Sequence, residues 1–497
     1  MADDPSERSA DFAAMAPYWQ KVDALLGGEA AMREAAETFL PRFPDESPSA
    51  YRLRTGAAKY TAIFQDICEA LAARPFAAPV ALSDTAPREL TTFAEDVDGR
   101  GNTLHVFAAE SFYAAVARGL DWILVDYPAD VPVGATRAEE RRRGARPYWV
   151  RYAAPDVLAV YTAMIGGREE VVHARLCEPA RERTGFTETT REQIRIFDRA
   201  ATDAGWGPPT VALWQRVERN GQQEWVEVEE PRPITLDTIP LVPFLTGHRI
   251  GGSWQIEPPM RGAADLQVTH YRQESALEWA KVMTAFPMLA GNGVTPETGE
   301  DGAPKPVPVG PHRVVYAPDG GTWRWIEPSA ESLRFLAEDV KQTARELREL
   351  GRQPLTAATG NLTVVTTAYA AQKGNSAVAA WALSLKDALE RALDLTARWL
   401  RIEGGAEVRL DTDFDAGLGD DDGFAHVLAL RERGEISRAA AIHEAKRRGL
   451  LDAHYDPEAD LAALLGEIEE EDLPPPDPSG AEETEGTPPS EGAADAA

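Results

Sequence analysis

Cysteine and long apolar runs are scarce in this sequence. Only Cys68 and Cys177 occur among its 497 residues, and two isolated thiols argue against a disulfide framework and for a reducing compartment. No stretch approaches the roughly 20 apolar residues that a membrane-spanning helix needs. Residues 1–17 are acidic and lack the apolar segment of a signal peptide. We therefore expect a protein that is made in the cytoplasm and does not enter a membrane.

Basic residues are in the minority. The chain has 51 Lys and Arg against 81 Asp and Glu, a formal net charge of −30. Residues 466–497 hold 11 of the acids and no Lys or Arg, so the first 465 residues still carry 70 acids against 51 bases. Tight non-specific binding of DNA needs cations on the phosphates, so this balance argues against it. It is compatible with a protein that lets DNA slide past, and equally with acidity that only maintains solubility.

Motifs for catalysis or metal binding are missing. There is no Gly-x-x-x-x-Gly-Lys-Ser/Thr phosphate loop, no His-Glu-x-x-His and no Gly-x-Ser-x-Gly, and the eight His are scattered. Asp411, Asp413 and Asp415 alternate as the oxygens of a calcium loop do. However, Ala416 stands where such a loop needs Gly, and Asp422 where Glu is usual. A solvated loop is the favoured interpretation, and we expect no enzyme activity, no cofactor and no metal.

Residues 147–244 predict antiparallel strands, because apolar and polar residues alternate along them. Gly166-Gly167 and Asn220-Gly221 each separate two alternating segments, so a hairpin is expected at both places. Asn-Gly in particular suits a type I′ turn. Pro240 and Pro243 argue against a central strand in the segment that follows.

Three long helices are expected after this region, over residues 261–286, 329–350 and 376–401. The stretch between the first two is rich in Gly and Pro, and within it residues 313–316 and 322–326 predict a short strand pair around a Pro-Asp-Gly-Gly turn. The segment between the second and third helices is rich in Thr, Ala and Gly and has no clear period, which indicates a loop.

The C-terminal part predicts a short strand, two short helices and a tail. The strand covers residues 407–410, and Gly434 separates the helices. Ser437 is the expected N-cap of the second helix. Beyond Glu467 the composition is Glu, Pro, Gly, Ser and Ala, which is typical of disorder.

The order of these elements resembles that of the portal proteins of tailed double-stranded DNA bacteriophages. In portal proteins a first stem helix, a small clip, a second stem helix, a tunnel loop and a spine helix follow one another, as the segments from residue 261 to residue 401 do here. The end of the chain is similar too: Asp411-Thr412-Asp413-Phe414 is followed by Gly434-Glu435-Ile436-Ser437 and then by Gly449-Leu450-Leu451.

The N-terminal part resembles one divergent portal-like phage family in particular. The similar segments are short and keep their order along the chain: Tyr18-Trp19, Gly27-Gly28-Glu29-Ala30-Ala31-Met32-Arg33, Phe39-Leu40-Pro41-Arg42, Tyr51 and Ile239-Pro240-Leu241-Val242-Pro243-Phe244. The resemblance covers residues 18–451, and the acidic tail beyond Glu467 departs from it.

The resemblance implies an α+β fold with long stem helices, a mixed wing with antiparallel strands, a small clip and a helical C-terminal region. The implied parts follow one another along the chain: residues 1–257 as N-terminal helices and wing, 258–290 as first stem helix, 291–328 as clip, 329–351 as second stem helix, 352–375 as tunnel loop, 376–403 as spine helix of the wing, 404–465 as C-terminal wing and crown, and 466–497 as acidic disordered tail.

A portal function is implied as well. Portal proteins form a ring, usually of twelve copies, at one vertex of the capsid, through which DNA is packaged and ejected. The implied partners are further copies of the chain, the major capsid protein, the large subunit of the terminase, a head–tail adaptor and the double-stranded DNA in the channel. The implied location is the virion, and the resemblance assigns no catalysis to the chain.

Some residues are expected to approach DNA under this resemblance. The candidate channel cations are Lys341, Arg345, Arg348, Arg352 and Lys373, and the candidate tunnel-loop residues are Thr359, Gly360, Asn361 and Thr363. The alternative is that the cations are ordinary surface charges paired along a helix, for example Glu338 with Lys341 or Arg345 with Glu349.

Two other functions stay open at this stage. Another head–tail structural protein, such as an adaptor or a minor head protein, would assemble without long stem helices and a clip. A carboxylate-dependent hydrolase would instead show a deep pocket that holds acids with shifted pKa values.

Overall fold

A computed structural model describes most of the chain. The described residues are 4–128, 136–203, 205–219, 221–285, 288–295, 298–299, 316–317, 319–326, 330–352, 364–412, 421–447, 450–451 and 455–461. They fall into two compact units, residues 1–414 and residues 415–497, and each unit is described by itself. The predicted acidic tail, residues 466–497, lies outside the described residues.

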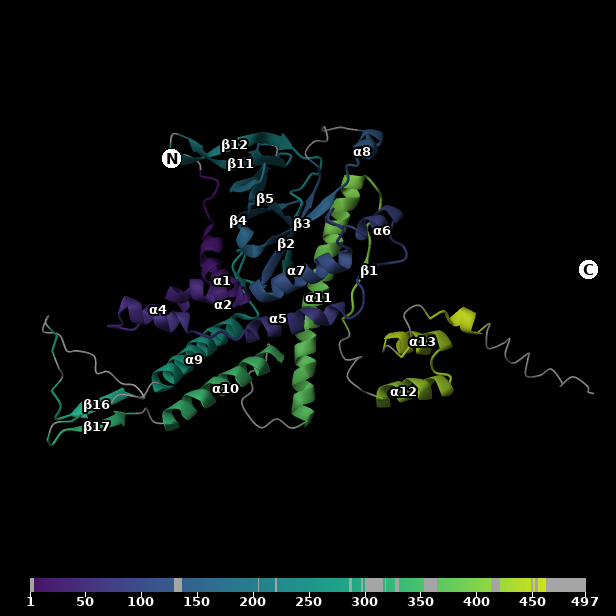
Figure 1. The fold of residues 1–497 in the computed structure, drawn as a ribbon. Coiled ribbons are helices and arrows are strands. Elements are labelled where there is room, and N and C mark those ends of the chain that lie inside the picture. The colour runs from purple at the N-terminus through teal and green to yellow at the C-terminus, as the bar shows by residue number, and fades with distance from the viewer. Residues whose placement is uncertain are drawn as a thin grey trace, which may run out of the picture. The chain divides into compact units, whose positions relative to one another are not determined.

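Helices form most of the first 120 residues (Figure 1). The Ser9 hydroxyl caps the first of them by accepting a hydrogen bond from the Phe12 N–H at 3.1 Å, as Ser does at helix starts. The helices are α1 (Ala10–Leu26), α2 (Gly28–Glu34), α3 (Ala36–Phe39), α4 (Pro48–Gly56), α5 (Ile63–Ala73), α6 (Arg88–Ala94) and α7 (Leu104–Arg118).

A three-stranded antiparallel sheet lies at the centre of the first unit, in the order β13-β2-β3 (Leu241–Leu245, Leu120–Asp126 and Tyr148–Ala153). The prediction from the two prolines is confirmed, because β13 is an edge strand. Pro240 accepts from the Val125 N–H at 2.9 Å, so the even-numbered residues of β13 bond to β2. Pro243 therefore faces the unpaired edge, where its missing N–H leaves no gap in the ladder.

The larger sheet has five antiparallel strands and confirms both predicted hairpins. Its order is β12-β11-β8-β5-β4, that is Gln222–Pro233, Thr210–Arg219, Gln193–Asp198, Arg168–Cys177 and Val157–Ile165. Gly166, Gly167 and Gly221 all have positive φ, which the tight turns require. Arg219 pairs with Gln222, so the second hairpin has the expected two-residue loop.

The first unit also holds short strand pairs and one short helix. β6 and β7 (Ala180–Thr184 and Thr187–Arg191) form a hairpin that follows β5. The others are β1 with β18 (Ala81–Leu82 and Val408–Arg409), β9 with β10 (Ala201–Thr202 and Gly205–Trp206) and β14 with β15 (His248–Arg249 and Ile256–Glu257), and the helix is α8 (Arg137–Arg143).

The first of the long helices, α9 (Arg261–Ala285), ends before the predicted boundary at residue 290. Residues Met288–Asn292 are strand β16, and β16 pairs with β17 (Thr322–Ile326) in place of the predicted partner 313–316. Of that predicted strand, residues 313–315 lie outside the described residues. The short apolar run at the start of β16 is compatible with a helix or a strand, so the spacing of its apolar residues did not identify it as a strand.

The tunnel-loop prediction for residues 352–375 is wrong over its second half. Helix α10 (Ala330–Arg352) is followed, after residues that are not described, by α11 (Val364–Leu400), so residues 364–375 are helical. The sequence misleads here because the β-branched run at Val364 and the pair Gly374-Asn375 have low helix propensity. Propensity is a weak guide within a helix of 37 residues.

Helix α11 packs along the central sheet and α7 (Figure 1). The Trp149 indole on β3 donates to the Thr396 hydroxyl on α11 at 2.9 Å, and the Ser384 hydroxyl donates to the Leu245 carbonyl at 2.9 Å. The apolar face of α11 is buried at positions separated by three or four residues: Val378, Ala382, Leu385, Leu389, Ala392 and Leu393.

The second unit contains α12 (Asp421–Glu432) and α13 (Arg438–Arg447). The predicted cap is confirmed, because the Ala440 N–H donates to the Ser437 hydroxyl at 3.1 Å. Throughout the described residues, no helix combines the length and the apolar character that crossing a membrane requires. With its antiparallel sheets and its many helices, the chain has the expected α+β fold.

Candidate functional site: a two-helix arm with a cationic stripe

The two long helices α9 and α10 run antiparallel and are extended by the two strands between them. Leu350 Cδ2 lies 3.8 Å from where a Cβ at Gly262 would stand, and the Gln273 amide donates to the Asp339 carboxylate at 2.7 Å. Strands β16 and β17 continue this pairing in antiparallel register. We call α9, β16, β17 and α10 together the arm.

Polar contacts attach α9 to the N-terminal helices. Gln267 is fully buried; its carbonyl accepts from the Phe64 N–H at 2.8 Å and its amide donates to the Thr61 carbonyl at 2.9 Å. The Thr61 hydroxyl donates to the Glu274 carboxylate at 2.9 Å, and the Lys59 ammonium lies 3.2 Å from that carboxylate. These bonds fix α9 in position along α5 through specific partners.

The buried face of α9 also carries a titratable group. His270 is 3% exposed, and burial lowers its pKa. Its Nδ1 lies 3.8 Å from Glu274, one turn away, and the charges of Arg348 and Lys59 act against protonation. Within the described residues Nδ1 has no hydrogen-bond partner. The face that α9 turns to the protein thus holds a His that is neutral at pH 7 among buried polar groups and apolar side chains such as Tyr271.

The exposed face of α10 carries a stripe of cations. Lys341, Arg345 and Arg348 are exposed and follow one another at spacings of four and three residues. Arg334 is exposed on the same face, and the four positions lie inside about 60° of arc at roughly 100° per residue. We call these four residues the cationic stripe. Sequence reasoning missed Arg334, although its spacing to Lys341 was visible in the sequence.

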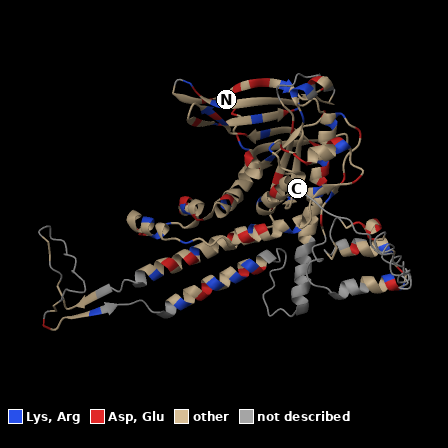
Figure 2. Cartoon of the chain, turned by 45° about the vertical axis from the view of Figure 1, so that its right-hand side comes forward, with Lys and Arg blue, Asp and Glu red and all other residues tan. Residues whose placement is uncertain are grey.

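Acidic residues lie beside the cationic stripe. Glu346 and Glu349 are exposed on the neighbouring face, and the Gln342 amide donates to Glu346 at 2.9 Å. Figure 2 shows red and blue positions interleaved along both helices of the arm. The cations of α10 thus form a row in a chain that is acidic as a whole, with acidic side chains such as Glu338 beside them.

Some of the predicted site residues are brought together and others are not described. The described part of α10 places Lys341, Arg345 and Arg348 in one row, while the side chains of Arg352 and Lys373 are not described. Lys373 lies in α11, which is not the expected loop. The predicted residues Thr359, Gly360, Asn361 and Thr363 lie outside the described residues.

The expected ion pairs of the stripe differ from those found. Arg345 pairs with Glu338 at 2.8 Å, two turns away, and both side chains are exposed. Among the described residues, no ion pair joins Glu338 to Lys341 or Arg345 to Glu349. An exposed pair of this kind contributes about 0–1 kcal/mol, so the stripe is not held rigid by it.

The calcium-like aspartates fall largely outside the structure. Asp411 follows β18, whereas Asp413 and Asp415 are not described. In the part of the chain that is described, no group of three or more His, Cys, Asp or Glu side chains is placed to hold a metal ion.

One buried acid bears on the hydrolase alternative. Burial raises the pKa of Asp121 to about 7, against the opposing effects of the Arg151 guanidinium and the Ser111 hydroxyl, which donates at 2.8 Å. The side chain is fully buried on β2 and closed to a substrate. Its shifted pKa therefore belongs to the packing of the core.

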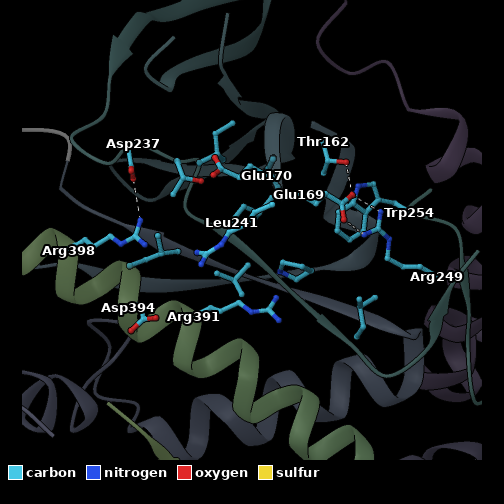
Figure 3. A pocket seen from close by; sticks show the side chains of 18 residues that line it. Thr162, Glu169, Glu170, Asp237, Leu241, Arg249, Trp254, Arg391, Asp394 and Arg398 are labelled. Carbon is cyan, nitrogen blue, oxygen red and sulfur yellow. Dashed lines mark hydrogen bonds and ion pairs between the residues drawn. The ribbon is translucent and has the colours of Figure 1, made fainter. Parts of the chain in front are cut away.

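A cleft of about 400 Å³ opens between β5, β13 and α11 (Figure 3). Around it, Arg249 binds the Glu169 carboxylate through two bonds of 2.8 and 3.0 Å, and Arg398 lies 3.3 Å from Asp237. Arg391 extends from α11 toward the cleft. Acidic and basic side chains are equally represented in the lining, which does not fit a site for one strongly charged ligand.

Comparison with known proteins gives one family model and a set of solved structures. The chain is similar to a chain of the solved neck of a native gene transfer agent (GTA) particle computed with C12 symmetry, at 16% identity and a TM-score of 0.37, over 85% of this chain and 99% of that one. It is also similar to a chain in the neck of the empty GTA particle computed with C6 symmetry, at 15% identity and a TM-score of 0.36, over 89% and 99% of the two chains.

A third solved structure, the virion of the native particle, contains a chain that is similar at 15% identity and a TM-score of 0.36, over 87% of this chain and 98% of that one. No curated protein sequence matches. The family model is described as a domain of unknown function (DUF4055) and matches residues 259–400. The matched segment runs from just before the arm to the end of α11.

Proposed function

We propose that this chain is the portal protein of a tailed bacteriophage or a phage-like particle, and that copies of it form a ring around a DNA channel. The observation that carries the proposal is the arm. Two antiparallel helices of 25 and 23 residues are joined by a small strand pair and followed by a 37-residue helix that packs into the body. At about 1.5 Å per residue, each arm helix is roughly 35 Å long, enough to form the wall of a channel.

Charge on the arm suits the passage of DNA. The chain is acidic, so phosphates meet few strong binding sites on it, and cations that do approach DNA act as weak contacts. In this proposal the cationic stripe of α10 supplies those contacts. Its neighbouring acids limit how tightly a phosphate is held, so that DNA moves in either direction.

The proposed contacts and partners follow from a ring at a capsid vertex. Neighbouring copies contact one another head to tail, as closed cyclic assembly requires. The five-stranded sheet faces the major capsid protein, and β16 with β17 docks first the terminase large subunit and later a head–tail adaptor. Twelve copies are the proposed number, the location is the virion, and the chain itself catalyses no reaction.

Electron microscopy of the purified protein tests the proposal. We expect large rings with a central channel in negative stain, and a mass of about twelve subunits by light scattering. A chain that stays monomeric or dimeric at micromolar concentration would contradict the proposal. A variant that lacks residues 286–328 separates ring formation from docking of the terminase. It should still form rings but should not bind the terminase.

A further inference from the structure

The hairpin β6–β7 leaves an aromatic side chain in water. Phe186 is fully exposed at the turn, next to Gly185 with φ +63°, and every side chain from residue 181 to residue 191 is exposed. A two-stranded ribbon with both faces in water is marginal by itself. An exposed aromatic at the tip of such a ribbon is the form that an interface anchor takes. We call residues 180–191 the knob.

The base of the knob is fixed to the five-stranded sheet. Arg191 donates to the Gln215 side chain at 3.4 Å and pairs with Glu182 across the hairpin at 2.7 Å. The Arg216 N–H donates to the Glu192 carbonyl at 2.9 Å, and its guanidinium lies 2.7 Å from the Glu192 carboxylate. The knob is therefore tied at its base to β11.

The cleft between β5, β13 and α11 is complementary to the knob, because its lining is partly apolar and its rim carries a cation. Its lining includes the apolar side chains Ile239, Leu241, Pro243 and Leu395, and its volume of about 400 Å³ is in the range of pockets that bind a side chain or a small molecule. On its rim Arg391 is exposed and makes no hydrogen bond or ion pair with the described part of the chain. The cleft thus offers an apolar seat and an unpaired cation (Figure 3).

The knob and the cleft lie at opposite ends of one strand. Residues 168–171 at the start of β5 line the cleft, and the knob begins three residues after β5 ends at Cys177. Nine residue steps along the strand span about 30 Å. Two complementary patches on opposite ends of a rigid sheet are what a head-to-tail contact between identical subunits requires.

We propose that the knob of one copy of this chain inserts into the cleft of the next copy, with Phe186 seated on the apolar lining. Glu188, two residues from Phe186, faces the unpaired Arg391 of the neighbour. The inference rests on the proposed ring, because a head-to-tail contact gives a closed assembly only when the copies are arranged in a ring. It adds to that ring a specific contact outside the arm.

Cross-linking between copies tests the contact directly. Phe186→Cys and Thr238→Cys place one thiol on the knob and one at the rim of the cleft. Under mild oxidation we expect the double variant to give a ladder of covalent oligomers on denaturing gels, while each single variant does not. A double variant that stays monomeric on the gel, although it forms rings in the microscope, would overturn the contact and leave the ring standing.

Truncation of the anchor gives an independent measure. We expect Phe186→Ala to raise the protein concentration for half-maximal ring assembly at least about ten-fold, which corresponds to about 1.4 kcal/mol, because truncation of a seated aromatic anchor costs at least this much. Val228→Ala, which truncates another exposed side chain of the same sheet, is the matched control and should assemble as the wild type does. Equal assembly of both variants overturns the contact, and a wild-type chain that forms no ring overturns the contact and the proposed function together.

Discussion

The two helices of the arm are similar in length, yet they are held by different forces. Helix α9 buries the polar side chains Gln267, His270 and Glu274 beside apolar ones such as Tyr271. In the described part of α10, Leu347 is fully buried and the charged side chains are exposed or only half-buried. Directional hydrogen bonds therefore add to apolar burial in fixing the position of α9, whereas α10 is held mainly by packing and carries its cations on the outer face.

Removal of apolar volume from α10 should give the largest effect on stability. We expect Leu347→Ala to lower the free energy of unfolding by about 2–5 kcal/mol, because the side chain is fully buried and leaves a cavity. Denaturant unfolding measures the change. Phe335→Ala on the same helix is the control; its side chain is 74% exposed, and the expected change is within about 0.5 kcal/mol. Equal losses of stability in the two variants would contradict the view that burial of Leu347 holds α10 in place.

Removal of a hydrogen-bonding side chain from α9 should come next. Gln267→Leu keeps the volume but leaves the Phe64 N–H and the Thr61 carbonyl without their partner. We expect a loss of about 1–3 kcal/mol, the cost of unsatisfied buried polar groups. Gln342→Leu on the exposed face of α10 is the control and should change the stability little. If Gln267→Leu were neutral, the hydrogen bonds would not specify the position of α9.

His270 on α9 should contribute to the pH dependence of stability, in the opposite direction to Asp121, whose raised pKa makes stability fall as the pH rises toward 7. Since burial lowers the pKa of His270 below its ordinary value of 6.5, the unfolded chain binds more protons than the folded chain just below that pH. The contribution of His270 to the free energy of unfolding should therefore rise as the pH rises toward 6.5 and level off above it, and the difference between wild type and His270→Gln isolates it. Urea titrations at pH 5.5 and 7.5 check the slope. His270→Gln should reduce it, while His248→Gln, at an exposed position, should leave it unchanged.

The cationic stripe should have the smallest effect on stability and a distinct effect on function. We expect the triple variant Lys341→Gln, Arg345→Gln and Arg348→Gln to change the free energy of unfolding by less than about 1 kcal/mol, since these side chains are exposed. In a packaging reaction the same variant should protect less DNA from nuclease than the wild type. Normal protection by folded variant rings would remove the stripe from the proposed channel.

Sequence patterns predicted the elements whose local signals are strong. The turns at Gly166-Gly167 and Asn220-Gly221, the cap at Ser437 and the edge position of Pro243 are all confirmed, because each depends on backbone geometry that few residues satisfy. The α+β class that the resemblance to portal proteins implied is also found.

Elements that depend on tertiary contacts could not be predicted from the sequence. Strand β16 forms because β17 lies opposite it, and residues 364–375 are helical as part of a helix whose later turns pack in the core. On α9 the buried apolar positions, such as Val268 and Tyr271, are mixed with the buried polar residues Gln267, His270 and Glu274, so the apolar spacing marks only part of the inward face. Three of the candidate channel cations are exposed in one row, which leaves their role in a channel a prediction. Phe186 could not be singled out from the sequence, because it is a single aromatic residue in a polar segment.

The proline on the outer edge of β13 has a consequence for how copies come together. Bare strand edges of two copies can join through their backbones in any register. Pro243 withholds an amide at the middle of that edge. At this edge Pro243 therefore disfavours pairing between the backbones of two copies, and leaves contacts between side chains to join the copies in the proposed ring.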